Sequence, residues 1–208
     1  MSNDGTSANQ QSSSSIGNIQ LPADLGEKLF QLRDYTPIPL IVMMLWLAHP
    51  FVLSVTVGMM MVVAGELLRV YAVSFIGGVS RTRTDSTGGN VISEGPFAYS
   101  RNPLYIGNFL ISVGFAVYSG SILVVLLTIG LFVFQYHHIV NYEEGLLMAR
   151  FGTPYDEYMR RVPRWLPSHV PALDDLKWPD SFTPALRSEK RTLTAIALMI
   201  VALLITSL

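Results

Sequence analysis

Two adjacent carboxylates, Glu143 and Glu144, follow an uncharged stretch that runs from Asn102 to Tyr142. The phrase EGPFAYSRNPLYIG, from Glu94 to Gly107, leads into the start of that stretch. Carboxylates can pair with an ammonium group or accept a proton, and the exposed backbone N–H groups of a helix start favour a carboxylate ligand. These residue types predict a site built from both segments, provided that the chain brings their ends together.

The distribution of charge predicts a membrane protein. Hydrophobic residues make up 50% of the 208 positions and charged residues 14%, against about 25% charged residues in a typical soluble domain. Three segments contain no Lys, Arg, Asp or Glu: Tyr35–Gly65, Asn102–Tyr142 and Thr192–Leu208. A membrane-spanning helix needs about 20 apolar residues, so these segments predict an all-α integral membrane protein with about five transmembrane helices.

Turn signals divide the apolar segments into helices. His49-Pro50 precedes a helix that we expect from about Phe51 to Ile76, and Tyr118–Ser121 divides Asn102–Tyr142 into a helical hairpin. Both ends of this hairpin lie on one side of the membrane, so the Glu pair and the loop before the hairpin can meet. If the N-terminus is cytoplasmic, all 14 Lys and Arg residues are cytoplasmic, as the positive-inside rule requires. We therefore expect the N-terminus, the catalytic loops and a cofactor site at the cytoplasmic face.

The remaining segments predict the domain organisation. Residues 1–20 are polar and rich in Ser, Asn and Gln, as in a disordered tail. Residues 21–34 place leucines on one helical face with charges between them, which predicts an amphipathic interfacial helix. Residues 35–208 are expected to form a single membrane-embedded domain. Within it Glu66 and Arg69 share a helical face, either as a pair at the membrane boundary or facing a polar cavity.

Composition also argues against several classes of function. The net charge of −1 does not favour nucleic-acid binding, which normally needs a basic patch. The chain has no cysteine, which excludes disulfides, thiolate zinc sites and a Cys nucleophile. Adjacent positions on a helix point about 100° apart, so we expect no metal site at His137 and His138.

Three motifs resemble one family. GPFAYSRNPLYIG resembles the glycine-proline-aromatic, Arg-His-Pro-x-Tyr-x-Gly signature of the integral membrane methyltransferases, which include isoprenylcysteine carboxyl methyltransferases and phospholipid N-methyltransferases. EEGLLMARFGTPYDEYMRRVPRWLP resembles the Glu-Glu, Phe-Gly-x-x-Tyr-x-x-Tyr and Val-Pro-Arg segment of the same family. LRVYAVSFIGG resembles the helix that precedes the cofactor loop, and the motif core covers roughly residues 68–167.

The resemblance implies S-adenosylmethionine as methyl donor and a lipid or other apolar small molecule as acceptor, taken from the membrane bilayer. A carboxylate such as Glu143 or Glu144 would pair with the ammonium group of the donor, and the loop would bind its carboxylate. The expected cofactor-binding residues are Gly95, Pro96, Phe97, Arg101, Asn102, Tyr105, Gly107, Glu143 and Glu144.

The expected catalytic residues are Glu143, Glu144, Arg164 and His138. Methyl transfer from a sulfonium is an in-line displacement that depends on positioning, and a carboxylate could take the proton of an amine acceptor. Arg164 would contact either an acidic substrate head or the Glu pair, and His138 would face the substrate.

Two departures from the family pattern concern the substrate. Asn102 stands where the family has His, and it keeps hydrogen bonding but does not titrate near neutral pH. The isoprenylcysteine enzymes place an Arg about one turn before the Glu pair, where this chain has Tyr136 to Ile139, so a prenylcysteine carboxylate would lack that partner. Two other functions stay open: a nicotinamide-dependent membrane reductase related to sterol reductases, and a non-catalytic membrane protein that keeps the fold.

Overall fold

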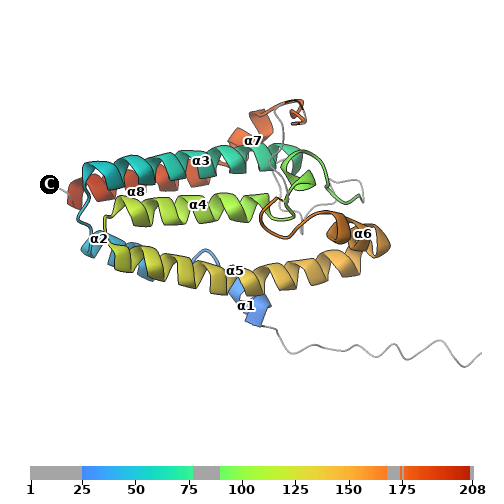
Figure 1. Ribbon diagram of the computed structural model, residues 1–208, viewed down its shortest axis with the longest axis horizontal. Helices are drawn as coiled ribbons and strands as arrows, with labels where there is room; N and C mark the ends of the chain where they lie inside the picture. The colour runs from blue at the N-terminus through green and yellow to red at the C-terminus, as the bar shows by residue number, and fades with distance from the viewer. Residues whose placement is uncertain (1–24, 77–89, 168–173, 175, 207–208) are drawn as a thin grey trace, which may run out of the picture.

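The computed structural model describes residues 25–76, 90–167, 174 and 176–206 (Figure 1). The expected polar tail, residues 1–20, lies outside these residues, as does nearly all of Gly77–Asn90, which its Gly, Ser and Thr content predicts as a loop. Every element in the described part of the chain is helical, in agreement with the predicted all-α class. The elements are α1 (Leu25–Leu32), α2 (Ile38–Trp46), α3 (Val52–Ile76), the 3-10 helix η1 (Gly95–Ala98), α4 (Pro103–Tyr118), α5 (Ile122–Phe151), α6 (Thr153–Arg161), α7 (Thr183–Ser188) and α8 (Lys190–Thr206).

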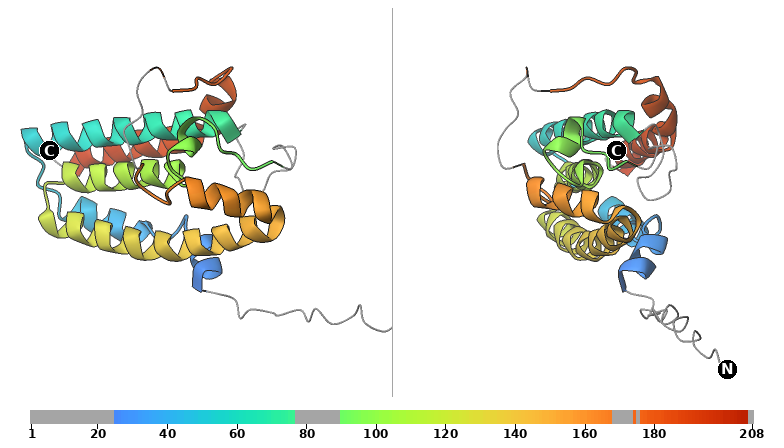
Figure 2. Two further views of the ribbon diagram at one scale, coloured as in Figure 1. Left: turned by 45° about the vertical axis from the view of Figure 1, so that its right-hand side comes forward. Right: turned by 90° about the vertical axis from the view of Figure 1, so that its right-hand side faces the viewer.

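The long helices run along one axis of the molecule. In Figures 1 and 2, α3 and α8 lie above α4, and α5 lies below it, with α2 beside the first half of α5 and α1 packed against its middle. The α2–α3 and α4–α5 connections lie at one end, which we call the turn end, and α8 also finishes there. The loop with η1, the end of α5, α6 and α7 lie at the opposite end, which we call the polar end.

Hydrogen bonds fasten the two connections at the turn end to each other. His49 N–H donates to the Ser119 carbonyl at 2.7 Å, and Ser54 Oγ donates to the Tyr118 carbonyl at 3.3 Å. Ser54 Oγ also accepts from Phe51 N–H at 3.0 Å, so it caps the start of α3. The turns predicted at His49-Pro50 and Tyr118–Ser121 are therefore where the helices reverse.

Two helices, α3 and α5, are long and apolar enough to cross a membrane. The shorter apolar helix α4 has 16 residues and α8 has 17, which corresponds to about 24–26 Å of helix against a hydrocarbon core of about 30 Å. The nine residues of α2 are shorter still. The structure thus contains two of the expected five helices at full spanning length, and the total number of crossings stays a prediction.

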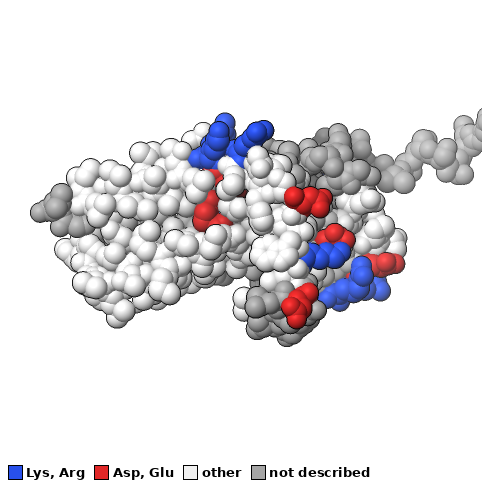
Figure 3. Space-filling model, turned by 90° about the horizontal axis from the view of Figure 1, so that it is seen from above, with Lys and Arg blue, Asp and Glu red and all other residues white. Residues whose placement is uncertain are grey.

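Charge is segregated along the same axis. On the face seen in Figure 3, the part of the molecule toward the turn end carries no Lys, Arg, Asp or Glu among the described residues, and charges of both signs gather toward the polar end. Many large apolar side chains of α3 and α5 are exposed, among them Val52, Leu53, Leu123 and Leu126. An apolar exposed surface of this kind is typical of a helix bundle that faces lipid.

Glycines bring the backbones of α3 and α4 into direct contact. A Cβ atom on Gly58 would lie 2.5 Å from the Gly114 carbonyl oxygen, and one on Gly114 would lie 2.8 Å from the Gly58 carbonyl oxygen. About two helical turns closer to the polar end, a Cβ atom on Gly65 would lie 2.7 Å from the Gly107 carbonyl oxygen. Small residues at such crossings are the usual means by which membrane helices pack closely.

A buried ion cluster ties the start of α8 to α3. Arg69 Nη2 donates to Glu189 Oε2 at 2.6 Å and lies 3.3 Å from Thr192 Oγ1, while its Nη1 donates to Asn108 Oδ1 on α4. Glu66 Oε2 is 3.6 Å from Arg69 Nε, and neither oxygen of the Glu66 carboxylate has a hydrogen-bond partner. Two carboxylates therefore share one guanidinium, which is the partner that keeps both of them buried.

Replacement of Gly58 by Ala is expected to lower the free energy of unfolding by about 1–3 kcal/mol, because the added methyl group overpacks a contact between two backbones. The matched control is Gly130→Ala on α5, where nothing lies within 4 Å of the added Cβ. Unfolding in mixed micelles, followed by circular dichroism, measures both variants. Equal stability of the two variants would contradict the close α3–α4 contact.

Arg69→Met is expected to lose about 3–5 kcal/mol of stability, because it leaves two buried carboxylates without their cation. Glu66→Gln should change stability by less than about 1 kcal/mol, because it removes a buried charge that lacks hydrogen bonds and leaves the Arg69–Glu189 pair intact. Arg160→Met, which breaks an exposed pair with Asp156, is the control with an expected effect below about 1 kcal/mol. The same unfolding measurement ranks the three, and an Arg69→Met effect as small as the control would refute the cluster's role.

Candidate functional site

A polar cavity of about 490 Å³ lies at the polar end, between the loop before α4, the last turns of α5 and the start of α8. Its volume falls within the range of about 300–1,000 Å³ that is usual for small-molecule sites. Aromatic side chains and charges of both signs line it. The expected site residues among its lining are Phe97, Arg101, Asn102, Tyr105, Glu143 and Glu144.

The loop before α4 is held by α6 and by the segment that follows it. Tyr158 Oη donates to the Phe97 carbonyl at 2.8 Å, and Arg101 N–H donates to the Pro163 carbonyl at 2.9 Å. Tyr158 and Phe97 are each 1% exposed, so this contact is part of a packed core. Gly95 has φ +56°, and a Cβ atom there would lie 2.4 Å from the ring of Phe75 on α3. The loop therefore needs glycine at this position for both its backbone and its packing.

Glu144 joins α5 to two arginines from different segments. Arg164 Nη2 lies 2.5 Å from Glu144 Oε2, and Arg101 Nε lies 3.4 Å from Glu144 Oε1. Asn102, which stands at the His position of the motif, donates from Nδ2 to the Arg164 carbonyl at 3.0 Å. Asn102 therefore helps to hold Arg164 beside Glu144. The structure thus brings Arg101 and Asn102 of the loop close to Glu144, as the hairpin topology predicts, and Arg164 contacts the Glu pair, which is one of the two alternatives considered for it.

Glu143 points to a different partner from its neighbour. Its Oε2 accepts a 2.7 Å hydrogen bond from the hydroxyl group of Tyr105 on α4. The Tyr105 ring packs against Tyr136 at a centroid distance of 4.7 Å, and Tyr136 stacks on Phe132 at 4.0 Å. Glu143 therefore contacts the first of three packed aromatic rings, Tyr105, Tyr136 and Phe132, which extend from the polar cavity toward the turn end.

Several expected site residues lie beside the cavity and do not line it. Gly107 meets Arg69 and the Gly65 backbone, where a Cβ would lie 2.5 Å from Arg69 Cγ. Gly95 and Pro96 form the turn of η1, and Arg164 reaches the site through Glu144. The His138 ring packs edge-on against Phe134, at 5.0 Å between centroids, and is not among the residues that line the cavity.

The structure adds residues that sequence reasoning did not place in the site. Arg69, Asn108, Glu189 and Thr192 line the cavity opposite the Glu pair, and Arg33 reaches it from the segment after α1. The Glu66–Arg69 spacing did indicate a polar contact, but Glu189 lies 120 positions from Arg69 in the chain. Glu189 is the single acidic residue among the charged residues just before the apolar stretch Thr192–Leu208, and this is the signal that could have suggested it.

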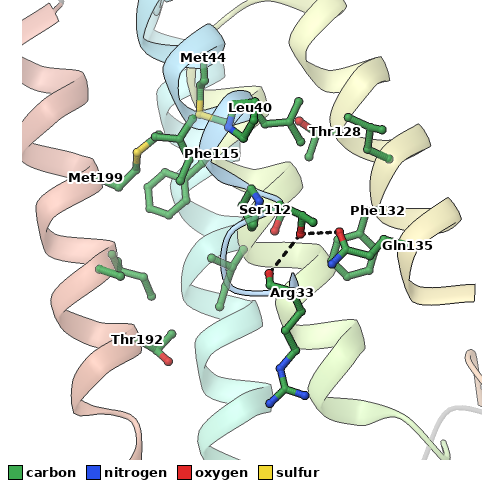
Figure 4. A pocket seen from close by; sticks show the side chains of 18 of the residues that line it. Arg33, Leu40, Met44, Ser112, Phe115, Thr128, Phe132, Gln135, Thr192 and Met199 are labelled. Carbon is green, nitrogen blue, oxygen red and sulfur yellow. Dashed lines mark hydrogen bonds between the residues drawn. The ribbon is translucent and has the colours of Figure 1, made fainter. Parts of the chain in front are cut away.

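A second, apolar cavity of about 810 Å³ adjoins the polar one (Figure 4). Helices α2, α4, α5 and α8 supply aliphatic and aromatic side chains to it, including Met44, Phe115 and Met199. Arg33, Tyr136 and Thr192 line both cavities. The two spaces are therefore neighbours that share a wall, one suited to charged groups and the other to hydrocarbon.

Among the described residues, no group of three or more His, Cys, Asp or Glu side chains is placed to hold a metal ion. His137 makes its side-chain contact with the amide of Asn141 at 3.2 Å, one turn further along α5.

Residues 53–154 match the model of a family described as phospholipid methyltransferase. A nickel-cobalt-cadmium resistance protein of Alcaligenes xylosoxydans xylosoxydans is 30% identical over 112 residues, which are 54% of this chain and 49% of that protein. A protein-S-isoprenylcysteine O-methyltransferase of Schizosaccharomyces pombe is 32% identical over 78 residues, 37% of this chain and 33% of that enzyme. A cobalt-zinc-cadmium resistance protein of Cupriavidus metallidurans is 28% identical over 115 residues, 55% of this chain and 50% of that protein.

The chain thus spans between a third and a half of the length of these curated relatives. No solved structure matches it. The segment matched by the family model contains nearly all of α3, the loop with η1, α4 and α5, and so it includes the loop and the Glu pair around the polar cavity. The family match and the isoprenylcysteine methyltransferase relative confirm the resemblance that the motifs indicate: the chain is similar to the integral membrane methyltransferases.

Proposed function

We propose that the chain transfers a methyl group from S-adenosylmethionine to a lipid or another apolar small molecule at a membrane surface. The observation that carries this proposal is the pair of adjoining cavities, one polar and one apolar, with Arg33, Tyr136 and Thr192 in the shared wall. A methyltransferase needs a charged donor and its acceptor to meet in line, and the shared wall is the place where ligands of the two cavities would meet.

The chemistry of the polar cavity fits the donor. S-adenosylmethionine carries an ammonium group, a carboxylate and a sulfonium, and it supplies an electrophilic methyl group. The Glu pair offers a carboxylate for the ammonium, at Glu143, and Arg101 offers a guanidinium for the carboxylate. The rings of Tyr105 and Tyr136, 4.7 Å apart beside the apolar cavity, offer faces that attract a cation.

The contacts of the two glutamates favour different roles for them. Glu144 is 8% exposed and has Arg101 and Arg164 at its two oxygens, so its charge is already balanced within the protein. Glu143 lines the polar cavity, and the hydrogen bond that it accepts from the Tyr105 hydroxyl orients its carboxylate at the cavity wall. We therefore propose Glu143 as the ammonium-binding carboxylate and Glu144, Asn102 and Arg164 as the residues that hold the loop around it.

The membrane arrangement belongs to the same proposal. The polar end would lie at the cytoplasmic surface, where it can take up a soluble donor, and the turn end would lie in the bilayer. Exposed apolar side chains on α3 and α5 support this arrangement, as does the gathering of charge toward the polar end in Figure 3. An apolar acceptor would enter the larger cavity from the lipid phase. His138 keeps its predicted role only if the acceptor extends toward the outer face of α5.

The purified protein in lipid nanodiscs is expected to bind S-adenosylmethionine with micromolar affinity in calorimetry. Glu143→Gln should weaken this binding about tenfold or more, because it removes the charge that pairs with the ammonium group. Glu157→Gln, an equivalent change at an exposed position of α6, is the control and should bind as the native protein does.

Transfer of labelled methyl groups into a total lipid extract tests the reaction itself. Labelled lipid product, identified by its mass, is the expected result. Absence of donor binding in native-like lipid would refute the proposal. Oxidation of a nicotinamide cofactor on addition of an olefin, without methyl transfer, would establish the reductase alternative instead.

Ser112→Phe is expected to reduce methyl transfer to lipid about tenfold or more and to leave the affinity for S-adenosylmethionine unchanged. Ser112 lines the apolar cavity and not the polar one, so an added ring fills acceptor space only (Figure 4). Val133→Phe, at a 58% exposed position of α5, is the control for the added bulk. Unchanged transfer by Ser112→Phe would show that the acceptor binds elsewhere.

A further inference from the structure

Arg33 lies at the junction of the two cavities and outside the segment that matches the family model, residues 53–154. We propose that Arg33 binds the anionic head of an amphiphile, a carboxylate or a phosphate, whose hydrocarbon part occupies the apolar cavity. The inference rests on the proposed use of that cavity for the acceptor, and it names a ligand chemistry and a residue that the methyltransferase motifs do not supply.

Contacts between α1 and α5 fix the place of Arg33. Gly26 allows a close approach, because a Cβ atom there would lie 2.6 Å from the His138 carbonyl oxygen. The ring of Phe30 packs against Tyr142 at 5.9 Å between centroids. After α1, Thr36 Oγ1 is hydrogen-bonded both to Gln135 Oε1 at 2.9 Å and to the Arg33 carbonyl at 3.2 Å. The backbone of Arg33 is therefore held against the middle of α5.

The side chain of Arg33 is directed toward the shared wall. Figure 4 shows Arg33 and Thr192 at one end of the apolar cavity and Met44 at the other, with the guanidinium group pointing away from Met44. The guanidinium carbon lies 4.1 Å from the centre of the Phe30 ring. Stacking on this ring covers one face of the group and leaves the N–H donors at its edge for a ligand.

Among the described residues, Arg33 has no buried carboxylate as its ion-pair partner, unlike the neighbouring arginines. Arg69 faces Glu189, and Arg101 and Arg164 face Glu144, which are carboxylates with side chains 4% and 10% exposed. The ion pair of Arg33 among the described residues is with Asp34, at 3.8 Å from Nε to Oδ1, and the Asp34 side chain is 84% exposed. An exposed pair at this distance contributes little and is easily exchanged. A guanidinium group with only such an exposed ion pair can form paired hydrogen bonds with a carboxylate or a phosphate of a ligand.

The lining of the apolar cavity indicates that the anionic ligand also carries a hydrocarbon part. Its lining is mainly aliphatic and aromatic, and the Thr128 hydroxyl in it is buried without a hydrogen-bond partner. A free anion would use none of this surface, whereas an amphiphile would fill it with hydrocarbon and place its head beside Arg33. The two features together favour an anionic amphiphile over a neutral lipid or a small anion.

Calorimetry on the full chain in neutral detergent micelles, without methyl donor, tests the proposal. Oleate is expected to bind about tenfold more tightly than oleyl alcohol, which has the same chain and no charge. Arg33→Gln should abolish this preference while binding of oleyl alcohol persists, which shows that the cavity is intact. Arg33→Lys should restore part of the preference, and Arg160→Gln, an exposed change on α6, should retain all of it.

Equal affinity for oleate and oleyl alcohol, or an undiminished preference in Arg33→Gln, would overturn the proposal. Acetate and inorganic phosphate bound as tightly as oleate would also overturn it, because the apolar cavity would then have no part. A fall in affinity for S-adenosylmethionine in Arg33→Gln, with unchanged binding of oleate, would assign Arg33 to the donor instead. Oleate preference without any methyl transfer would refute the proposed enzymatic function and leave the anion site standing.

Discussion

The contact of α3 with α4, backbone against backbone, is the constraint on which the site depends. Gly65 and Gly107 let the two helices approach until no Cβ atom fits between them, and the same absence of a side chain at Gly107 gives Arg69 room to pass over α4. Arg69 can then reach Asn108 on α4 and Glu189 at the start of α8. Helix packing, the buried ion cluster and one wall of the polar cavity are therefore consequences of a single close approach.

The charges at the site form two clusters, each of which contributes residues to the lining of the polar cavity. On one side Arg101 and Arg164 balance Glu144, and on the other side Arg69 serves both Glu66 and Glu189. Buried charges without partners are unfavourable, so each cluster fixes the segments that contribute to it. Glu143 also lines the cavity and accepts a hydrogen bond from the Tyr105 hydroxyl on α4. Clusters that fix the segments around a cavity are what a preorganised binding site requires.

Sequence reasoning foresaw the parts of this arrangement that local rules determine. Uncharged segments and turn signals predict where the long helices reverse, and the hairpin topology predicts that Glu144 meets the loop with Arg101 and Asn102. The Arg69–Glu189 pair and the position of Arg33 depend on how distant helices pack, which no local pattern encodes. Helix lengths were also shorter than the apolar segments suggest, because turns and capping residues use positions at both ends of α2 and α4.

The division of the two cavities among the helices has a consequence for how such proteins diversify. The polar cavity draws its Glu pair and its loop from the segment that the family shares, whereas α1, α2 and α8, which supply much of the apolar cavity, lie outside that segment. Changes in the terminal segments can reshape the apolar cavity while the Glu pair and the loop of the polar cavity stay in place, and they alter the polar cavity only where Arg33 and the start of α8 line it. If the polar cavity holds the methyl donor, as proposed, variation in the terminal helices would let one donor site serve chemically different acceptors, and terminal sequence would then be a better guide to substrate than the motifs are.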